Sequence, residues 1–164
     1  MMLAQGDLRL PRENVGRHIR FADGTTGRVY RETAVDRPAP QQPCVLVVSF
    51  RLRGVRGRGH RAFEAESICN TLLFAGFPGL LTKLWIAHDG NGTYRGLYEW
   101  DGPLAAETYA RSLWRVLELV SEPGSIDFRV LPGLRRDEVL ANPGLLDRHG
   151  QAEPGAWWRV VEAA

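Results

Sequence analysis

The chain has 164 residues, of which 44% are hydrophobic and 24% charged, and its formal net charge is only +2. Such a chain can form one globular domain with its own core, and its small net charge gives no reason to expect nucleic acid or another polyanion as a partner. No stretch approaches the roughly 20 apolar residues of a membrane helix, and the first residues lack the apolar run of a signal peptide. We therefore expect a cytoplasmic protein that binds neither a membrane nor nucleic acid.

The first 43 residues predict a hairpin followed by a linker. Strands around Ile19 and Val29 flank an Asp23-Gly24 turn, which is a strong hairpin signal. Prolines at 38, 40 and 43 make residues 36–43 a stiff connection that cannot be helical. We treat residues 1–43 as an N-terminal extension.

Residues 44–131 predict an α+β core with the ferredoxin-like order β-α-β-β-α-β. The expected elements are a strand at 44–52, a helix at 60–75, strands at 81–88 and 93–100, a helix at 101–120 and a strand at 126–131. Asp101 is the expected N-cap of the second helix. Residues 132–164 are Gly/Pro-rich until Ala156–Val161, a short apolar segment that we expect to dock on the core or on a partner chain.

The expected strands are apolar on both faces, whereas a ferredoxin-like sheet has helices on one face only. The other face must then be covered, and a second copy of the same sheet is the economical answer. This predicts a homodimer with a dimeric α/β barrel.

One face of the expected 81–100 hairpin looks like a small-molecule site. If Gly90-Asn91 is the turn, Lys83 lies opposite Tyr98 and Trp85 opposite Gly96, on the same face as Tyr94 and Trp100. Lys83 is the only lysine among 21 basic residues. Aromatic walls with a few polar groups suit a small organic ligand, and Trp85 is expected to lie over Gly96. Ordinary core packing is the alternative, above all for Trp85 and Trp100.

The segment FPGLLTKLWIAHDGNGTYRGLYEW, residues 77–100, resembles the YdhR-like monooxygenases of the dimeric α/β-barrel superfamily, which includes the antibiotic-biosynthesis monooxygenases. The matching pieces are Pro78–Leu81, Lys83–Trp85 and Gly96–Tyr98, and the resemblance covers about residues 44–131. It implies oxidation of an aromatic or polyketide-like substrate by O2 without a metal or other cofactor. Haem-degrading relatives use a His for which no helix position here offers a match.

These expectations give each candidate residue a role. Lys83 would be a cation that stabilises a substrate anion, and Tyr98 and Tyr94 would donate hydrogen bonds to it. The remaining candidates bind the substrate: Trp85 and Trp100 as walls, and Asn70 and Trp114 from the two helices. The alternatives are an isomerase or cyclase that uses the same pocket, and a non-catalytic binding or stress-response module.

Two further patterns carry weaker signals. Five arginines within residues 51–61 surround three glycines. This arrangement could bind an anion or form a lid over the pocket, but it matches no nucleotide-binding fingerprint. A solvated loop is the simpler interpretation. Cys44 and Cys69 are expected to be buried and reduced, with a disulfide or a reactive thiol as the alternatives. No Cys or His spacing predicts a metal site.

Overall fold

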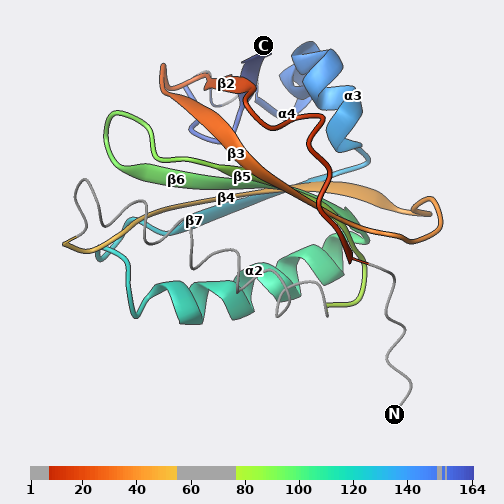
Figure 1. Ribbon diagram of the computed structural model, residues 1–164, viewed down its shortest axis with the longest axis horizontal. Helices are drawn as coiled ribbons and strands as arrows, with labels where there is room; N and C mark the ends of the chain where they lie inside the picture. The colour runs from red at the N-terminus through yellow and green to blue at the C-terminus, as the bar shows by residue number, and fades with distance from the viewer. Residues whose placement is uncertain (1–7, 55–76, 151–152, 154) are drawn as a thin grey trace.

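Eight antiparallel strands form one sheet in this computed structural model, which describes residues 8–54, 77–150, 153 and 155–164 (Figure 1). The strands are β1 Leu8–Arg9, β2 His18–Phe21, β3 Thr26–Val35, β4 Pro43–Arg51, β5 Leu80–Ile86, β6 Thr93–Asp101, β7 Asp127–Pro132 and β8 Val160–Ala163. The helical elements described are α2 Pro103–Leu117, α3 Arg136–Ala141, the 3-10 turn η1 Pro143–Leu146 and α4 Asp147–Gly150.

The core strands pair in the order β7-β4-β6-β5, with β4 at the centre between β6 and β7. This is the ferredoxin-like arrangement, since the first and third strands of the motif lie side by side and the second and fourth flank them. The predicted α+β fold class is therefore confirmed. The helix expected at 60–75 and most of the arginine-rich segment lie outside the described residues.

The N-terminal hairpin is present and is longer than expected. Its turn is held by Asp23, whose Oδ1 accepts hydrogen bonds from the Thr25 backbone N–H at 3.0 Å and from the Thr25 hydroxyl. β3 continues to Val35 and pairs with β5, so the hairpin extends the core sheet at that edge.

Helix α2 packs on one face of the sheet and buries its apolar stripe there (Figure 1). Asp101 is not its N-cap, as the sequence had suggested. Asp101 is the last residue of β6, where its carboxylate accepts a hydrogen bond from the Gln42 N–H at 2.9 Å. Gly102 occupies the cap position with a φ of 106°, a conformation that costs glycine little.

The C-terminal extension covers the other face, on the opposite side of the sheet from α2 (Figure 1). Trp158 and Leu146 pack in one cluster with Val45, Leu84 and Leu97, which are 0% exposed within the single chain. The premise for a second copy is therefore wrong, because this face is already covered by residues of the same chain. The number of subunits remains a prediction.

Ion pairs to two buried carboxylates fasten this extension to the sheet. Arg136 of α3 bonds Glu32 of β3 at 2.9 Å, and their side chains are 5% and 2% exposed. Arg135 contacts Glu99 of β6 at 3.1 Å, and the same carboxylate accepts the Arg136 N–H. These contacts fix α3 on the face that the sequence left uncovered.

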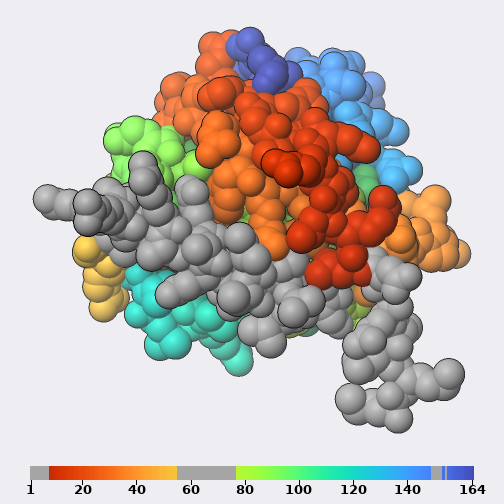
Figure 2. All heavy atoms as spheres, in the orientation of Figure 1, coloured from red at the N-terminus to blue at the C-terminus, as the bar shows by residue number. Residues whose placement is uncertain are grey.

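β8 completes the sheet beside β2, so the C-terminal strand lies next to the N-terminal hairpin. Ile19 pairs with Ala163 and Arg20 with Glu162. Figure 2 shows the C-terminal residues packed against the N-terminal hairpin at one end of the molecule. No helix among the described residues is long and apolar enough to cross a membrane.

Candidate functional site

The register of the β5–β6 hairpin is the predicted one. Lys83 pairs with Tyr98, Leu84 with Leu97, and Trp85 with Gly96. Because side chains alternate across a strand, Lys83, Trp85 and Tyr98 share the face on which α2 packs. The sequence therefore located this group of side chains correctly.

Lys83 lies buried between two aromatic rings. Its Nζ is 3.3 Å from the centre of the Trp85 ring and 4.7 Å from that of Tyr98, and the residue is 7% exposed. Burial lowers the Lys83 pKa well below its ordinary value, and the positive charge of Arg31 lowers it further. Both effects disfavour the charged ammonium form.

The Trp85 indole is held in place from β3. Its Nε1–H donates to the Thr33 hydroxyl at 3.0 Å, and the Arg31 guanidinium carbon lies 5.7 Å from the ring centre. Arg31 and Thr33 were missed by sequence reasoning, which placed a strand around Val29 but gave it no part in the site. The pairing of Thr33 with Lys83 follows only once β3 is known to lie beside β5.

Two tyrosine hydroxyls meet beside the lysine. Tyr98 and Tyr109 of α2 are 3.1 Å apart at their hydroxyl oxygens, with ring centres 5.2 Å apart. Burial raises both pKa values, and the neighbouring Tyr109 raises that of Tyr98 further. Both phenols therefore stay protonated. We call Arg31, Lys83, Trp85, Tyr98 and Tyr109 the Lys83 cluster.

The ring nearest to a Cβ built on Gly96 is that of Tyr98, rather than that of the expected Trp85. A Cβ built on Gly96 would approach Tyr98 Cε2 to 2.6 Å and Cζ to 3.0 Å. Only glycine leaves room for the ring in this position. Gly96 thus helps to set the position of Tyr98 next to Lys83.

The other predicted residues lie at the edges of the cluster or away from it. Tyr94 stacks on Phe50 at 5.8 Å near the hairpin turn. Trp100 is 0% exposed and packs on Tyr109 at 4.9 Å, as a core residue would. Trp114 donates its indole N–H to Glu118 at 2.8 Å on a different part of α2. Asn70 lies outside the described residues.

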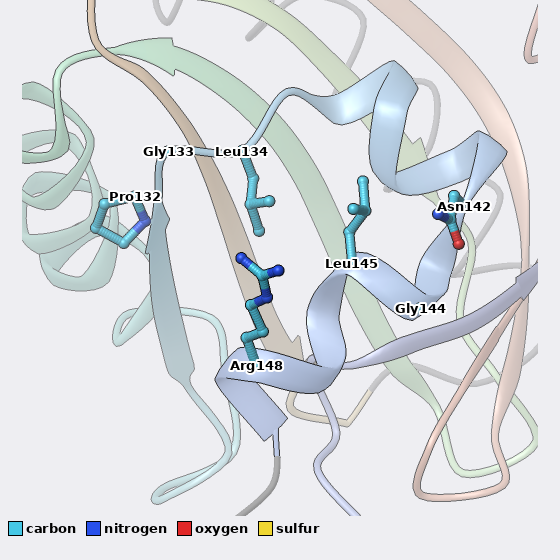
Figure 3. Close-up of a pocket in the computed structure, with 7 residues that line it drawn as sticks. All are labelled: Pro132, Gly133, Leu134, Asn142, Gly144, Leu145 and Arg148. Carbon is cyan, nitrogen blue, oxygen red and sulfur yellow. The ribbon is translucent and has the colours of Figure 1, made fainter.

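Two hollows lie elsewhere in the described structure. One of about 500 Å³ sits between the end of β7 and the C-terminal helices, where Arg148 and Leu134 extend toward one another (Figure 3). Its other lining residues are Pro132, Gly133, Asn142, Gly144 and Leu145. A smaller hollow of about 260 Å³ is lined by Trp114 with Arg53 and Glu118. Within the described residues, no group of His, Cys, Asp and Glu is arranged to hold a metal ion.

Comparisons with known proteins bear on the fold. No protein-family model matches the chain, and no curated protein matches it. One solved structure superposes with a TM-score of 0.50 at 14% identity, over 68% of this chain. It is an uncharacterized ferredoxin-fold protein from Listeria monocytogenes, related to antibiotic biosynthesis monooxygenases. The chain has a ferredoxin-like fold.

The structural match covers only part of each protein at low sequence identity, so it supports the fold and not a reaction. The match spans 66% of the Listeria monocytogenes protein, slightly less than two thirds of its length. A monooxygenase-like protein from Listeria innocua superposes with a TM-score of 0.48, also at 14% identity, over 68% of this chain and 67% of its own. At such identity the fold is shared, whereas the reaction has to be argued from the site.

Proposed function

We propose that this chain binds a small electron-rich aromatic compound at the Lys83 cluster and oxidises it with O2, as a monooxygenase that uses no metal or flavin. The observation that carries the proposal is the buried Lys83 amine against Trp85 and Tyr98. The fold likeness to a protein related to antibiotic biosynthesis monooxygenases supports it by analogy. It is also consistent with the YdhR-like resemblance of residues 77–100.

In this proposal Lys83 is a base. The sequence alone suggests a cation that stabilises a substrate anion, whereas burial lowers the Lys83 pKa and disfavours the charged form. A neutral amine can remove a proton from a phenol or an enol, which converts the substrate into an anion that O2 can oxidise. The proton then resides on Nζ, where the nearby Trp85 ring stabilises the ammonium ion.

The Tyr98–Tyr109 pair supplies the hydrogen-bond donors. Since both phenols remain protonated, Tyr98 can donate to the substrate oxygen while Tyr109 supports it. For a substrate with a CH2 group between aromatic rings, one O2 converts that CH2 into a carbonyl and releases one water. Trp85 would form a wall of the site, and Tyr94 and Trp100 its ends. Trp114 receives no role, because its indole N–H is bonded to Glu118.

Measurement of O2 uptake with an anthrone and with a hydroquinone tests the proposal. The wild type should consume O2 and, with ¹⁸O2, place one labelled atom in the product. Lys83→Met should lower the rate by roughly 10² or more, the usual contribution of a general base. Arg115→Met is the matched control, because it removes a cation from the exposed face of α2. Unchanged turnover in Lys83→Met would remove Lys83 from the mechanism.

The outcomes also separate the alternatives. Product formation without O2 uptake would favour an isomerase or cyclase. Saturable binding of either compound, with neither O2 uptake nor product, would favour a binding module. Because Lys83 is 7% exposed, a ligand reaches Nζ only by displacing the groups that cover it, so binding should perturb the tryptophan fluorescence.

Native mass spectrometry of the purified protein tests the remaining expectations. We propose a cytoplasmic homodimer, as the resemblance implies, although the second face of the sheet does not require one. A dimer with an aromatic adduct would support both the assembly and the ligand class. A monomer would leave the site proposal intact and remove the dimeric barrel.

A further inference from the structure

The smaller hollow, of about 260 Å³, is lined by residues that follow β4, by the last turn of α2 and by the loop before β7. Backbone contacts hold these segments together. The Arg53 N–H donates to the Val120 carbonyl at 2.8 Å, and Leu52 forms a β-bridge with Ser121. Arg53 is thereby fixed beside the end of α2. The hollow shares no lining residue with the Lys83 cluster.

A cation and an anion line this hollow, and neither forms an ion pair within the described part of the chain. Nη2 of Arg53 donates to the Ser121 carbonyl at 3.2 Å. Oε1 of Glu118 accepts the Trp114 indole N–H at 2.8 Å. A guanidinium has five N–H donors and a carboxylate has two oxygens, so each group retains capacity for a ligand.

An aromatic ring and apolar side chains form the rest of the wall. Trp114 is half-buried, and its ring meets that of Phe128 edge to face, with the ring centres 6.1 Å apart. Ile126, which is buried, and Pro123 add aliphatic surface to the same hollow. A ligand with both charges and a short apolar part would match these three kinds of surface.

Ser121 gives a second, independent indication of a ligand. The residue lines the hollow and is 1% exposed, yet its hydroxyl has no hydrogen-bond partner among the residues that the structure describes. Buried hydroxyls in folded proteins nearly always have a partner. Because the Arg53 guanidinium is bonded to the Ser121 carbonyl, an anion bound by Arg53 would lie next to this hydroxyl and is a suitable acceptor for it.

We propose that this hollow binds a free α-amino acid with a small aliphatic side chain. The carboxylate of the ligand is bound by Arg53, and its ammonium group by Glu118 and the face of Trp114. The aliphatic side chain packs on the apolar part of the wall. The volume lies below the roughly 300–1,000 Å³ of pockets for drug-sized ligands, which favours a molecule as small as an amino acid. Neither O2 nor the Lys83 cluster takes part, so this activity goes beyond the proposed oxidation.

Isothermal titration calorimetry of the full chain with L-leucine tests this inference. We expect saturable binding with a Kd of about 1 mM or tighter. 4-Methylpentanoate lacks the ammonium group of leucine, and 3-methylbutylamine lacks its carboxylate. Each should bind at least about tenfold more weakly than leucine, because it loses charge-assisted hydrogen bonds. Absence of leucine binding, or equal affinity for the three compounds, would overturn the inference.

A pair of variants places the ligand in this hollow. Glu118→Gln keeps an acceptor for the Trp114 N–H but removes the negative charge, so it should weaken leucine binding about tenfold or more. Glu107→Gln is the matched control, because it makes the same change at an exposed position of α2 that does not line the hollow. It should bind leucine as the wild type does. Equal affinity of the two variants would contradict the assignment of the site.

Arg53→Met tests the other end of the ligand. It should weaken leucine binding about tenfold or more, because the partner of the carboxylate is lost. Leucine binding that is unchanged in Arg53→Met would refute this orientation. The titrations contain no aromatic substrate and need no O2, so their failure is distinguishable from failure of the proposed oxidation.

Discussion

Replacement of Gly96 by alanine tests the geometry at the centre of the Lys83 cluster. The added methyl would lie 2.6 Å from Tyr98 Cε2 and 3.0 Å from Cζ, closer than carbon atoms approach in proteins. The ring has little room to retreat, because it is buried and its hydroxyl meets that of Tyr109 at 3.1 Å. Gly96→Ala must therefore displace Tyr98 or strain the sheet.

The expected cost follows from measured overpacking of protein cores. Inserting a methyl into a filled site costs about 1–3 kcal/mol. For a chain of this size, each kcal/mol lowers Tm by about 2–4 °C, so Gly96→Ala should melt about 2–12 °C below the wild type. Because Tyr98 moves away from Lys83, the proposed oxidation should also slow.

Thermal unfolding followed by circular dichroism measures this effect. Gly90→Ala is the matched control, since a Cβ at this exposed position of the same hairpin meets nothing within 4 Å. Its Tm should equal that of the wild type. If Gly96→Ala melts at the same temperature as Gly90→Ala, the Tyr98 ring does not lie over Gly96 and the reasoning is refuted.

Three further predictions concern buried polar groups. Because the Lys83 pKa is lowered on folding, the unfolded chain binds the extra proton between that lowered value and about 10.4. The wild type should therefore gain stability relative to Lys83→Met as the pH rises toward about 10 in urea titrations, and a constant difference would contradict this. Arg136→Met leaves Glu32 buried without its cation and should lower the free energy of unfolding by about 3–5 kcal/mol. Loss of the exposed pair of Arg111 should lower it by less than about 1 kcal/mol. Equal urea midpoints for the two variants would count against the buried pair. Burial raises the pKa of the Cys44 thiol to about 11, so a thiol reagent at pH 8 should label this cysteine only after unfolding, and rapid labelling of the native protein would disprove its burial.

Local signals in the sequence were sufficient for the central hairpin. The turn at Gly90-Asn91 fixes a register, and alternation then assigns Lys83, Trp85 and Tyr98 to one face without further information. The order of the described core strands and of α2 was predictable for the same reason, because each has its own periodicity and turn residues.

Long-range contacts were not predictable in this way. Arg31 and Thr33 join the site only because β3 lies beside β5, a pairing that no local pattern encodes. Likewise, Leu146 comes from a segment rich in glycine and proline with no clear periodicity, yet it helps to cover the second face of the sheet. The sequence predicted that Ala156–Val161 would dock on the core or on a partner chain, and Trp158 of this segment does pack on the core, but no local pattern showed on which face of the sheet it would lie.

The pairing of β2 with β8 has a consequence for how the chain is made. Ile19 meets Ala163, so the contact joins residues from opposite ends of the described chain. During synthesis, the hairpin of β2 and β3 leaves the ribosome long before its partner strand exists. Until β8 emerges, that edge exposes unpaired backbone groups on which other strands can add. The nascent chain is therefore prone to aggregation at this edge until β8 has been synthesised.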